Sequence, residues 1–351
     1  MMSDEAALPP FRCPRCKGPV ERRAEPAAYR CSACARIYPI RLGIPDFRVW
    51  PDRHLAVEDD WARAMRVLRA TGSGGFRAML EHYWRLSPDT PAALASRFVR
   101  YALVGVARGR TRLGRVAEVR GAPLGPADVV LDLGCGTGGL VVAGAEQAGA
   151  VVGVDIAARW LIVARRQLEE AGVRNAMLVC ACAEQLPFAD GTFDVVVASD
   201  VLEHSQAQAR LLGEIRRALR PAGLLLLVTQ NRWSLLGEPH ARVWGVGFLP
   251  RRWMNRYVRL VRGVPYRLIR LVSPPELDRL LRGAGLRISR RLLSRVASAE
   301  LEGLAAGEWR LALLYRFLSR IPALRLPLLL LGPAIEVAAR PDDCPAPGRG
   351  R

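Results

Sequence analysis

The central third of the chain alternates short, β-branched apolar runs with longer segments whose apolar residues recur at helical spacing. The runs predict strands at 128–133, 150–155, 176–181, 193–199 and 223–230. The intervening segments predict helices near 138–148, 158–171 and 205–219. Strands that alternate with helices are typical of a parallel sheet with crossover helices. We therefore expect an α/β domain here.

The pattern changes on both sides of this domain. Residues 52–120 have helical spacing, as in WARAMRVLRA, and the insertion 231–272 is rich in rings and arginine. The segment SPPELDRLLRGAG then predicts a helix capped by Ser273, and LRISRRLL and AIEVAAR predict two closing strands. We divide the chain into a cysteine-bearing module at 11–49, a helical region and linker at 52–125, and an α/β domain at 126–340.

Composition and charge narrow the function only slightly. The 351 residues carry a formal net charge of +19, but every basic residue except Lys17 is arginine, and the arginines are spread along the chain. A nucleic-acid partner is therefore a less favoured hypothesis. No apolar run approaches the ~20 residues of a membrane-spanning helix, and no apolar leader follows the first residues. We expect a cytoplasmic protein without a transmembrane segment.

A glycine-rich loop, VLDLGCGTGG, follows the first expected strand. Gly134, Gly136 and Gly138 allow a tight turn and a close approach of a ligand to the backbone. Asp155 ends the next strand about 20 residues later, where a carboxylate can accept both hydroxyls of a ribose. An ordinary strand-to-helix turn is the alternative. The combination favours a site for a nucleoside-containing cofactor.

Four motifs in order carry a resemblance to a known family. VLDLGCGTGG, VVGVDIA, CAEQLPFADGTFDVVVASDVLEH and RRALRPAGLLLLV resemble the motifs of class I S-adenosylmethionine-dependent methyltransferases, especially the type 11 group that includes quinone-biosynthesis enzymes. The resemblance covers about residues 126–230. It implies a Rossmann-like, seven-stranded sheet and S-adenosylmethionine as cofactor.

The resemblance also implies cofactor-binding roles for nine residues: Asp132, Gly134, Gly136, Gly138, Asp155, Ile156, Cys182, Ala183 and Ser199. The glycines would pass under the methionine part, Asp132 would orient its ammonium group, Asp155 would hold the ribose, and Ile156 would lie against the adenine. The family usually has an acidic residue where this chain has Cys182. Backbone groups around Ala183, or the side chain of Glu184, are the alternative partners of the adenine amino group.

Two of the four histidines fall where a catalytic base could work. His204 ends the segment SDVLEH, and His240 lies in the insertion. A base assists methyl transfer when the acceptor is a hydroxyl, because the proton must leave. The alternatives are that His204 packs against or caps the following helix, and that His240 has a structural role in its loop.

The insertion is enriched in aromatic residues: Trp233, Trp244, Phe248, Trp253, Tyr257 and Tyr266. As a lid, these rings would exclude water and bind an apolar or ring-bearing acceptor. Alternatively, they close the core of an added subdomain, or stack on unpaired bases.

The opening cysteines have the spacing of a metal site. Cys13, Cys16, Cys31 and Cys34 form two Cys-x-x-Cys pairs, which predict a tetrahedral, structural zinc site with no open position. The stretch CSACARIYPIRLGIPDF resembles the small zinc-ribbon activator of tRNA and release-factor methyltransferases, over about residues 11–48. The resemblance suggests a built-in activator or substrate platform. A ribbon that has lost its metal is the alternative.

These observations lead to three hypotheses of function. We favour an S-adenosylmethionine-dependent methyltransferase that acts on oxygen or carbon of a small-molecule or lipid-linked acceptor. An rRNA or tRNA methyltransferase with zinc-ribbon recognition is the alternative, and a non-catalytic protein that keeps the fold is the third.

The leucine-rich C-terminal segment carries Arg310, Arg316, Arg320 and Arg325. It either packs onto the sheet, which we favour, or makes a peripheral contact with the inner membrane face.

Overall fold

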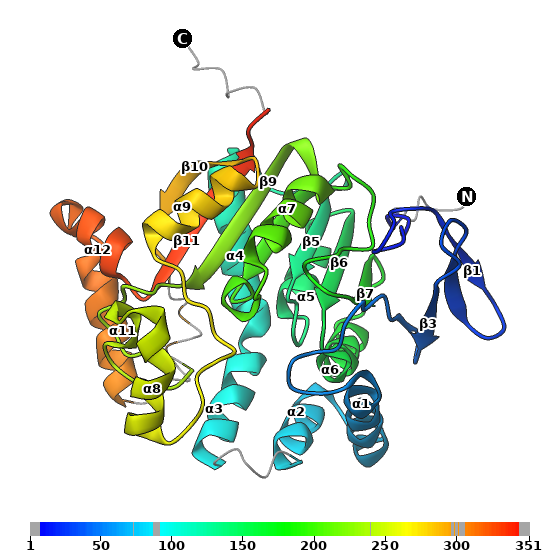
Figure 1. Cartoon of the computed structure of the whole chain (residues 1–351), viewed down its shortest axis with the longest axis horizontal. Helices are drawn as coiled ribbons and strands as arrows, with labels where there is room; N and C mark the ends of the chain where they lie inside the picture. Colours follow the sequence, from blue (N-terminus) through cyan, green and yellow to red (C-terminus); the bar gives the residue numbers. More distant parts are fainter. Residues whose placement is uncertain are drawn as a thin grey trace.

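The structure is a computed structural model that describes residues 8–343 except 73, 87–91, 239, 296–297, 299–300 and 302–305 (Figure 1). Within this part of the chain, the main sheet has seven strands in the order β10-β11-β9-β8-β5-β6-β7. Their bounds are β5 (Val129–Leu133), β6 (Ala150–Asp155), β7 (Ala176–Cys180), β8 (Phe193–Ser199), β9 (Leu219–Gln230), β10 (Leu286–Leu292) and β11 (Ala334–Pro341).

The strand directions confirm the expected class I methyltransferase sheet. β5 pairs in parallel with β6 and β8, β6 pairs in parallel with β7, and β8 pairs in parallel with β9. β11 runs antiparallel to both β9 and β10. Every parallel strand therefore has its carboxyl end at the same edge of the sheet, where ligands bind in open α/β folds.

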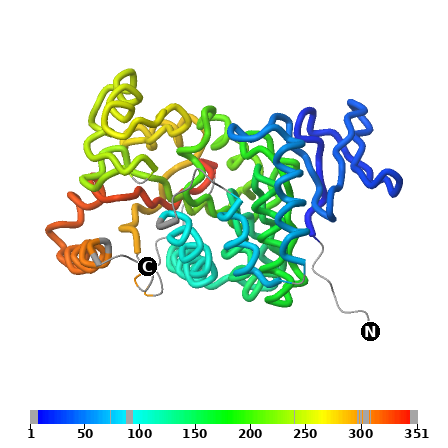
Figure 2. The backbone as a smooth tube through the Cα atoms, turned by 90° about the horizontal axis from the view of Figure 1, so that it is seen from below, coloured from blue at the N-terminus to red at the C-terminus, as the bar shows by residue number. Residues whose placement is uncertain are grey.

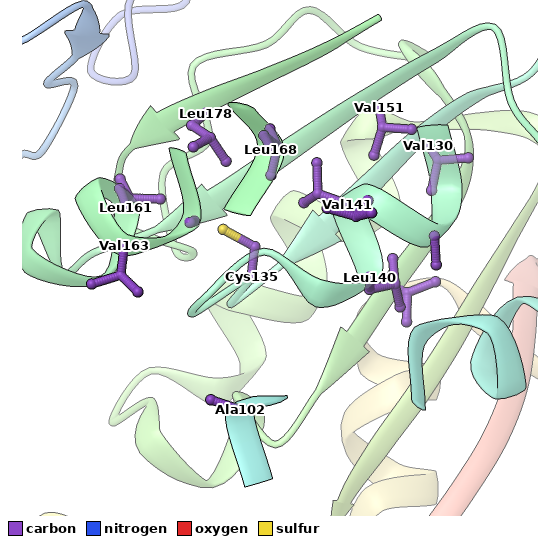
Figure 3. Packing of buried hydrophobic residues seen from close by; sticks show 14 of the residues in the cluster. Ala102, Val130, Cys135, Leu140, Val141, Val151, Leu161, Val163, Leu168 and Leu178 are labelled. Atoms are coloured by element: carbon purple, nitrogen blue, oxygen red, sulfur yellow. The ribbon is translucent and has the colours of Figure 1, made fainter. Parts of the chain in front are cut away.

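Alternate residues of each central strand point to opposite faces of the sheet, and each face has its own apolar core. Val130 and Val151 belong to one cluster, together with helices α5 (Gly139–Ala145) and α6 (Ala158–Glu170), as Figure 3 shows. Leu131 and Val152 belong to the other, together with α7 (Gln208–Ala218) and α9 (Pro274–Gly283). A sheet buried on both faces explains the continuous apolar runs.

Helices occupy the stretch that was expected to be helical. They are α1 (Val57–Thr71), α2 (Phe76–Arg85), α3 (Ala92–Leu103) and α4 (Gly105–Arg120). α4 crosses α5 so closely that a Cβ on Gly139 would lie 2.4 Å from the carbonyl carbon of Gly105. Arg115 of α4 also pairs with the buried Glu336 of β11 at 3.0 Å. This helix is therefore fixed to the glycine-loop helix and to the closing strand.

The N-terminal module is a small antiparallel sheet of β1 (Val20–Arg23), β2 (Ala28–Cys31), β3 (Ile37–Arg41) and β4 (Ile44–Pro45). β1 and β2 form a hairpin between the two cysteine pairs. The module docks beside β7, where Asp46 forms a parallel bridge with Cys180 and Phe11 forms an antiparallel bridge with Phe188. Its Phe47 belongs to the same apolar cluster as the strands of the main sheet.

The insertion and the C-terminal helices lie at the opposite flank of the molecule, in both Figure 1 and Figure 2. They comprise η2 (Val246–Phe248), α8 (Arg251–Arg262), α11 (Ala306–Leu318), η3 (Pro322–Leu324) and α12 (Arg325–Leu331). β10 and β11 confirm the two expected closing strands. The leucine-rich segment packs only in part, because the residues described at 307–331 alternate between half-buried and exposed and none is fully buried. A Gly-Pro turn leads directly into β11, so this segment caps the flank instead of covering a face.

Among the described residues, no helix is both long enough and apolar enough to cross a bilayer.

Candidate active site

The glycine loop at the end of β5 is left-handed at three positions. Gly134, Gly136 and Gly138 have φ values of 76°, 50° and 85°, a region that favours glycine. A Cβ on Gly134 would lie 3.0 Å from the Cβ of Val201, whereas a Cβ on Gly136 would meet nothing within 4 Å. The loop is therefore packed on one side and open at Gly136, where a ligand can approach the backbone.

Asp155 at the end of β6 is bonded to this loop. Its Oδ2 accepts a hydrogen bond from Gly136 N at 2.9 Å, and its Oδ1 accepts one from Ala157 N at 2.8 Å. Burial raises the pKa of this carboxyl group above its usual value, and the two backbone donors partly offset the shift. Each carboxylate oxygen keeps a free lone pair, so Asp155 can hold the loop and still accept a ribose hydroxyl.

Two further polar groups of the predicted cofactor site are buried. Burial raises the pKa of Asp132 to about 7, and the nearby charge of Asp155 acts in the same direction. Ser199 ends β8, and its Oγ is buried with no hydrogen-bond partner in the described part of the chain. Buried polar groups are normally satisfied, so such groups fit a site that a polar ligand completes. Together with the open loop, these groups fit the cofactor that the resemblance implies.

Cys182, which stands where the family named above usually has an acidic residue, faces the N-terminal segment. Cys182 is fully buried, and its Sγ lies 3.5 Å from both Val49 N and Trp50 O. Burial raises the pKa of this thiol to about 11, so it stays neutral at physiological pH. Ala183 is half-buried, and Glu184 accepts a hydrogen bond from Ser205 at 2.5 Å. The contact between Cys182 and adenine stays a prediction.

A buried charge network beneath this end of the site was not predicted from the sequence. The Arg48 side chain pairs with Asp46 and Asp60, each at 2.7 Å. Arg159 of α6 pairs with Asp60 and Asp52, also at 2.7 Å. Burial alone would raise the pKa of Asp46, but hydrogen bonds from Arg48 lower it below its usual value. The network ties the segment after the module to the helix that follows Asp155.

The network also reaches the adenine side of the predicted site. Arg48 donates a hydrogen bond from Nη1 to the carbonyl oxygen of Ile156 at 3.2 Å. Ile156, which was assigned to the adenine, is half-buried. The backbone that would face the adenine is therefore positioned from the N-terminal side of the chain.

The two predicted catalytic histidines come together. His204 lies in the short helix η1 (Leu202–His204) directly after β8, and its ring centroid is 5.1 Å from that of His240, with an interplanar angle of 84°. Glu238 lies 2.5 Å from Nδ1 of His240. The buried Glu203 is the third member of this group. Neither glutamate was singled out in the sequence, although Glu203 stands beside His204.

The two rings have opposite electrostatic surroundings. Although His204 is exposed, partial desolvation of its ring, and then the neighbouring His240, lower its pKa to about 4, so the ring is neutral at pH 7. Burial also acts to lower the pKa of His240, but the Glu238 carboxylate raises it above its usual value overall. Burial raises the pKa of Glu203 to about 7. Three titratable groups whose pKa values are shifted in different directions therefore meet here, as they do at functional sites.

The four cysteines of the module converge. Their sulfur atoms all lie within 4.8 Å of one another, with Cys13 and Cys34 at 3.6 Å and Cys16 and Cys31 at 3.5 Å. Tetrahedral zinc with Zn–S bonds of ~2.3 Å requires sulfur separations of about 3.8 Å. The donor set and spacing fit a structural zinc ion.

The two cysteine turns have the same backbone construction. Lys17 N donates to Cys13 O, and Ala35 N donates to Cys31 O, at 2.8 and 3.0 Å. Lys17 and Ala35 both have a φ of 58°. Each turn therefore presents its pair of thiols in the same local geometry.

The aromatic insertion divides into buried and exposed rings. Tyr266 is buried in a small cluster with Val243, Val246, Met254 and Val258, and Tyr257 packs against it. Trp244, Phe248 and Trp253 are exposed. A cavity of about 150 Å³ lies between this cluster and the end of β9, with Glu238 and Gln230 in its wall. The subdomain-core interpretation therefore holds for Tyr266, while three rings face outward.

Comparisons with known proteins agree with this site. Residues 131–227 match the family described as "Methyltransferase domain". The chain is 35% identical over 153 residues to the ubiquinone/menaquinone biosynthesis C-methyltransferase UbiE of Paraburkholderia xenovorans, covering 42% of this chain and 61% of that protein. It is 34% identical over 162 residues to the ubiquinone biosynthesis O-methyltransferase of Cereibacter sphaeroides, covering 45% and 59%. The chain thus spans about three fifths of each relative.

A solved structure is similar to the same region. The geranyl diphosphate C-methyltransferase of Streptomyces coelicolor matches with a TM-score of 0.43 and 18% identity, over 62% of this chain and 71% of that one. That score is low, so the strand order carries the fold assignment. The glycine loop, Asp155 and the segment around His204 all lie within residues 131–227. Residues 131–227 of this chain are therefore similar to methyltransferase domains.

Proposed function

We propose that this protein transfers a methyl group from S-adenosylmethionine to a small-molecule acceptor. The observation that carries the proposal is the joining of two half-sites at one edge of the sheet. The glycine loop and Asp155 form one half, and the segment that contains His204 begins at Val201, which packs against Gly134. When bound, the cofactor would supply an activated methyl group. The task of the chain is then to align an acceptor and handle its proton.

At the cofactor end, each residue has a distinct task. The backbone at Gly136 admits the methionine part, because no side chain occupies the space in front of it. Asp155 would accept the ribose hydroxyls while it holds the loop. Asp132, when ionised, would attract the ammonium group, and Ser199 Oγ would complete the polar lining.

At the acceptor end, the histidine pair would handle the proton of a hydroxyl acceptor. His204 is neutral at pH 7 because its pKa is lowered to about 4, so it is free to accept a hydrogen bond. Glu238 orients His240 through Nδ1. A carbon acceptor also loses a proton after methylation, so the same group suits oxygen and carbon acceptors.

The acceptor class is drawn from two observations. The relatives named above are, by their names, a C-methyltransferase of ubiquinone and menaquinone biosynthesis and an O-methyltransferase of ubiquinone biosynthesis. The exposed rings Trp244, Phe248 and Trp253 stand in the insertion that also supplies His240. We therefore propose an apolar, ring-bearing or lipid-linked acceptor. An RNA substrate is the second candidate, and no observation in this site favours it.

We infer that the N-terminal module supports the cofactor half of the site with a structural zinc ion. Its position beside β7 places Val49 and Trp50 against Cys182, and Arg48 against Ile156. Four thiolates fill the coordination shell of zinc, so the metal would have no catalytic role there.

A peripheral membrane contact would suit a lipid-linked acceptor, and we propose α11 and α12 for it. Trp309, Leu314, Phe317 and Leu326 are exposed there among several arginines. In Figure 2 the insertion and α11 lie at different levels of this flank. Wild-type protein should float with anionic liposomes at low salt, and the double variant Arg316→Glu, Arg320→Glu should not. Wild-type protein that stays at the bottom of the gradient would refute the contact.

Methyl transfer itself is tested with S-adenosylmethionine that carries a labelled methyl group. The protein is incubated with a lipid extract, a polar-metabolite extract and total RNA from the same cells. We expect label in the lipid or polar fraction, and loss of that label with Asp155→Ala. Label in RNA would select the second candidate. No transfer to any fraction, despite cofactor binding, would favour a non-catalytic protein.

A further inference from the structure

We propose that Glu203, His204 and His240 bind a divalent metal ion at the acceptor end of the site. The role of the ion in methyl transfer rests on the proposed function, but the existence of the site does not. One candidate ligand atom from each residue lies within 4.8 Å of the other two. The first two residues follow β8, and the third comes from the insertion after β9. The fold thus joins donors that are distant in sequence.

The buried carboxylate of Glu203 is the strongest indication of a cation-binding site. Glu203 has a relative exposure of 0%, and its Oε2 accepts a hydrogen bond from Thr229 at 2.8 Å. Its Oε1 is buried and has no hydrogen-bond partner within the described residues. A buried carboxylate without a full set of partners is costly, and a coordinated cation is one way to satisfy it. Within the part of the chain that the structure describes, no arginine or lysine forms a salt bridge with Glu203.

His240, the histidine from the insertion, has a carboxylate bonded to one ring nitrogen, as metal-binding histidines usually have. Nδ1 of His240 faces Glu238 Oε1 at 2.5 Å, which leaves Nε2 as the available donor atom. Glu238 is itself fixed, because its Oε2 accepts a hydrogen bond from Ala241 N at 2.6 Å. A carboxylate behind a ligating imidazole sets the ring orientation and raises its basicity.

The donor set indicates the class of ion. Two imidazoles and one carboxylate suit Zn²⁺, Fe²⁺, Co²⁺ or Mn²⁺ better than Mg²⁺, which prefers oxygen donors. This set also differs from the four thiolates of the module. Three protein ligands leave at least one coordination position open, so an acceptor hydroxyl could bind the ion and have its pKa lowered. With the ion bound, this would replace the proton acceptance by His204 that we propose for the site without metal.

Cobalt is a suitable probe because its visible spectrum distinguishes thiolate from nitrogen and oxygen ligands. The full-length protein is first loaded with one equivalent of zinc, which the four cysteines should take, and is then titrated with Co²⁺. We expect one further Co²⁺ per chain, without a sulfur charge-transfer band. His240→Ala should weaken this binding at least ten-fold, and Glu238→Gln should weaken it by about ten-fold or more.

A matched control comes from a histidine outside the cluster. His82 lies in α2, and His82→Ala should leave Co²⁺ binding unchanged. Zinc-loaded wild-type protein that binds no Co²⁺, or His240→Ala that binds it as tightly as the wild type, would overturn the proposal. Metal binding is measured without a methyl acceptor, so a failure of methyl transfer would refute the proposed function and leave this site standing. Methyl transfer by protein that binds no metal ion at this site would refute the metal site and leave the proposed function standing.

Discussion

The N-terminal module and the insertion are both rich in aromatic residues and flank the same sheet, but they differ in whether those rings are buried or exposed. Phe47 of the module is fully buried, and its ring centroid lies 4.8 Å from that of Phe11. In the insertion, Trp244 is 64% exposed and Trp253 is 46% exposed. Enrichment in rings therefore does not by itself separate a structural element from an interaction surface. The difference comes from what lies against the rings.

The two regions also differ in how they are attached. The module shares an apolar cluster with the main sheet and adds the buried Arg48 network beneath the site. The insertion has a separate small cluster around Met254 and Val258. The module therefore shares its core with the main sheet, whereas the insertion, for which we propose a role at the acceptor side, has a core of its own.

The largest expected effect is the loss of the module's zinc ion. Cys13→Ser should release the zinc and lower the free energy of unfolding of the whole chain, on the order of several kcal/mol, because the thiolates of this site hold the module together. Metal analysis and thermal unfolding measure both effects. Ser32→Ala, in the same turn as Cys31 but without a sulfur ligand, should keep the metal.

The apolar cluster that the module shares with the main sheet changes the unfolding behaviour that we expect after zinc loss. From the sequence, the methyltransferase domain is expected to survive while the module unfolds. In the structure, Cys13 and Phe47 lie in one cluster with strands of the main sheet, so we expect a single lowered transition. A domain transition that stays at the wild-type temperature after zinc loss would contradict the shared core.

The second prediction compares one ring from each region. Phe47→Ala should cost about 3–5 kcal/mol of unfolding free energy, because it removes a fully buried ring. Trp253→Ala should change it by less than about 0.5 kcal/mol, because its ring is largely exposed. Chemical denaturation of the two variants measures the difference. Equal costs would mean that the insertion is as firmly packed as the module.

The third prediction uses the buried carboxyl group of Asp132. Its pKa is raised to about 7 in the folded state, so the ligand-free protein retains a proton that the unfolded chain releases near pH 4. Its contribution to stability should therefore fall as pH rises from about 4 to about 7. Affinity for the positively charged cofactor should rise between pH 6 and pH 8. Calorimetry across this range should show a flatter profile for Asp132→Asn, and an unchanged profile would exclude Asp132 as the group.

The sheet could be predicted from the sequence because local patterns determine it. AVVGVD was expected as a strand at 150–155, and β6 spans Ala150–Asp155. The glycine loop was equally visible, because its three left-handed positions require residues without a side chain. Ser273 was expected to cap α9, and Glu276 completes its capping box.

The remaining features depend on contacts between distant segments. His240 reaches His204 only because the insertion folds back toward the end of β8, and hydrophobic periodicity contains no information about that return. The ion pair of Arg48 with Asp60 requires the module to dock beside β7. The leucines of α12 were expected to be covered by the sheet, but the turn into β11 leaves them half-exposed.

The most direct test of the account is calorimetric titration of the full-length protein with S-adenosylmethionine. We predict binding by the wild type, and a loss of about ten-fold or more in affinity for Asp155→Ala, because the carboxylate would accept two ribose hydroxyls and also holds Gly136 N. Asp190→Ala, which changes an exposed carboxylate paired with Arg217, is the matched control and should bind as the wild type does. Tight binding of a nicotinamide dinucleotide without binding of S-adenosylmethionine, or full affinity in Asp155→Ala, would contradict the account.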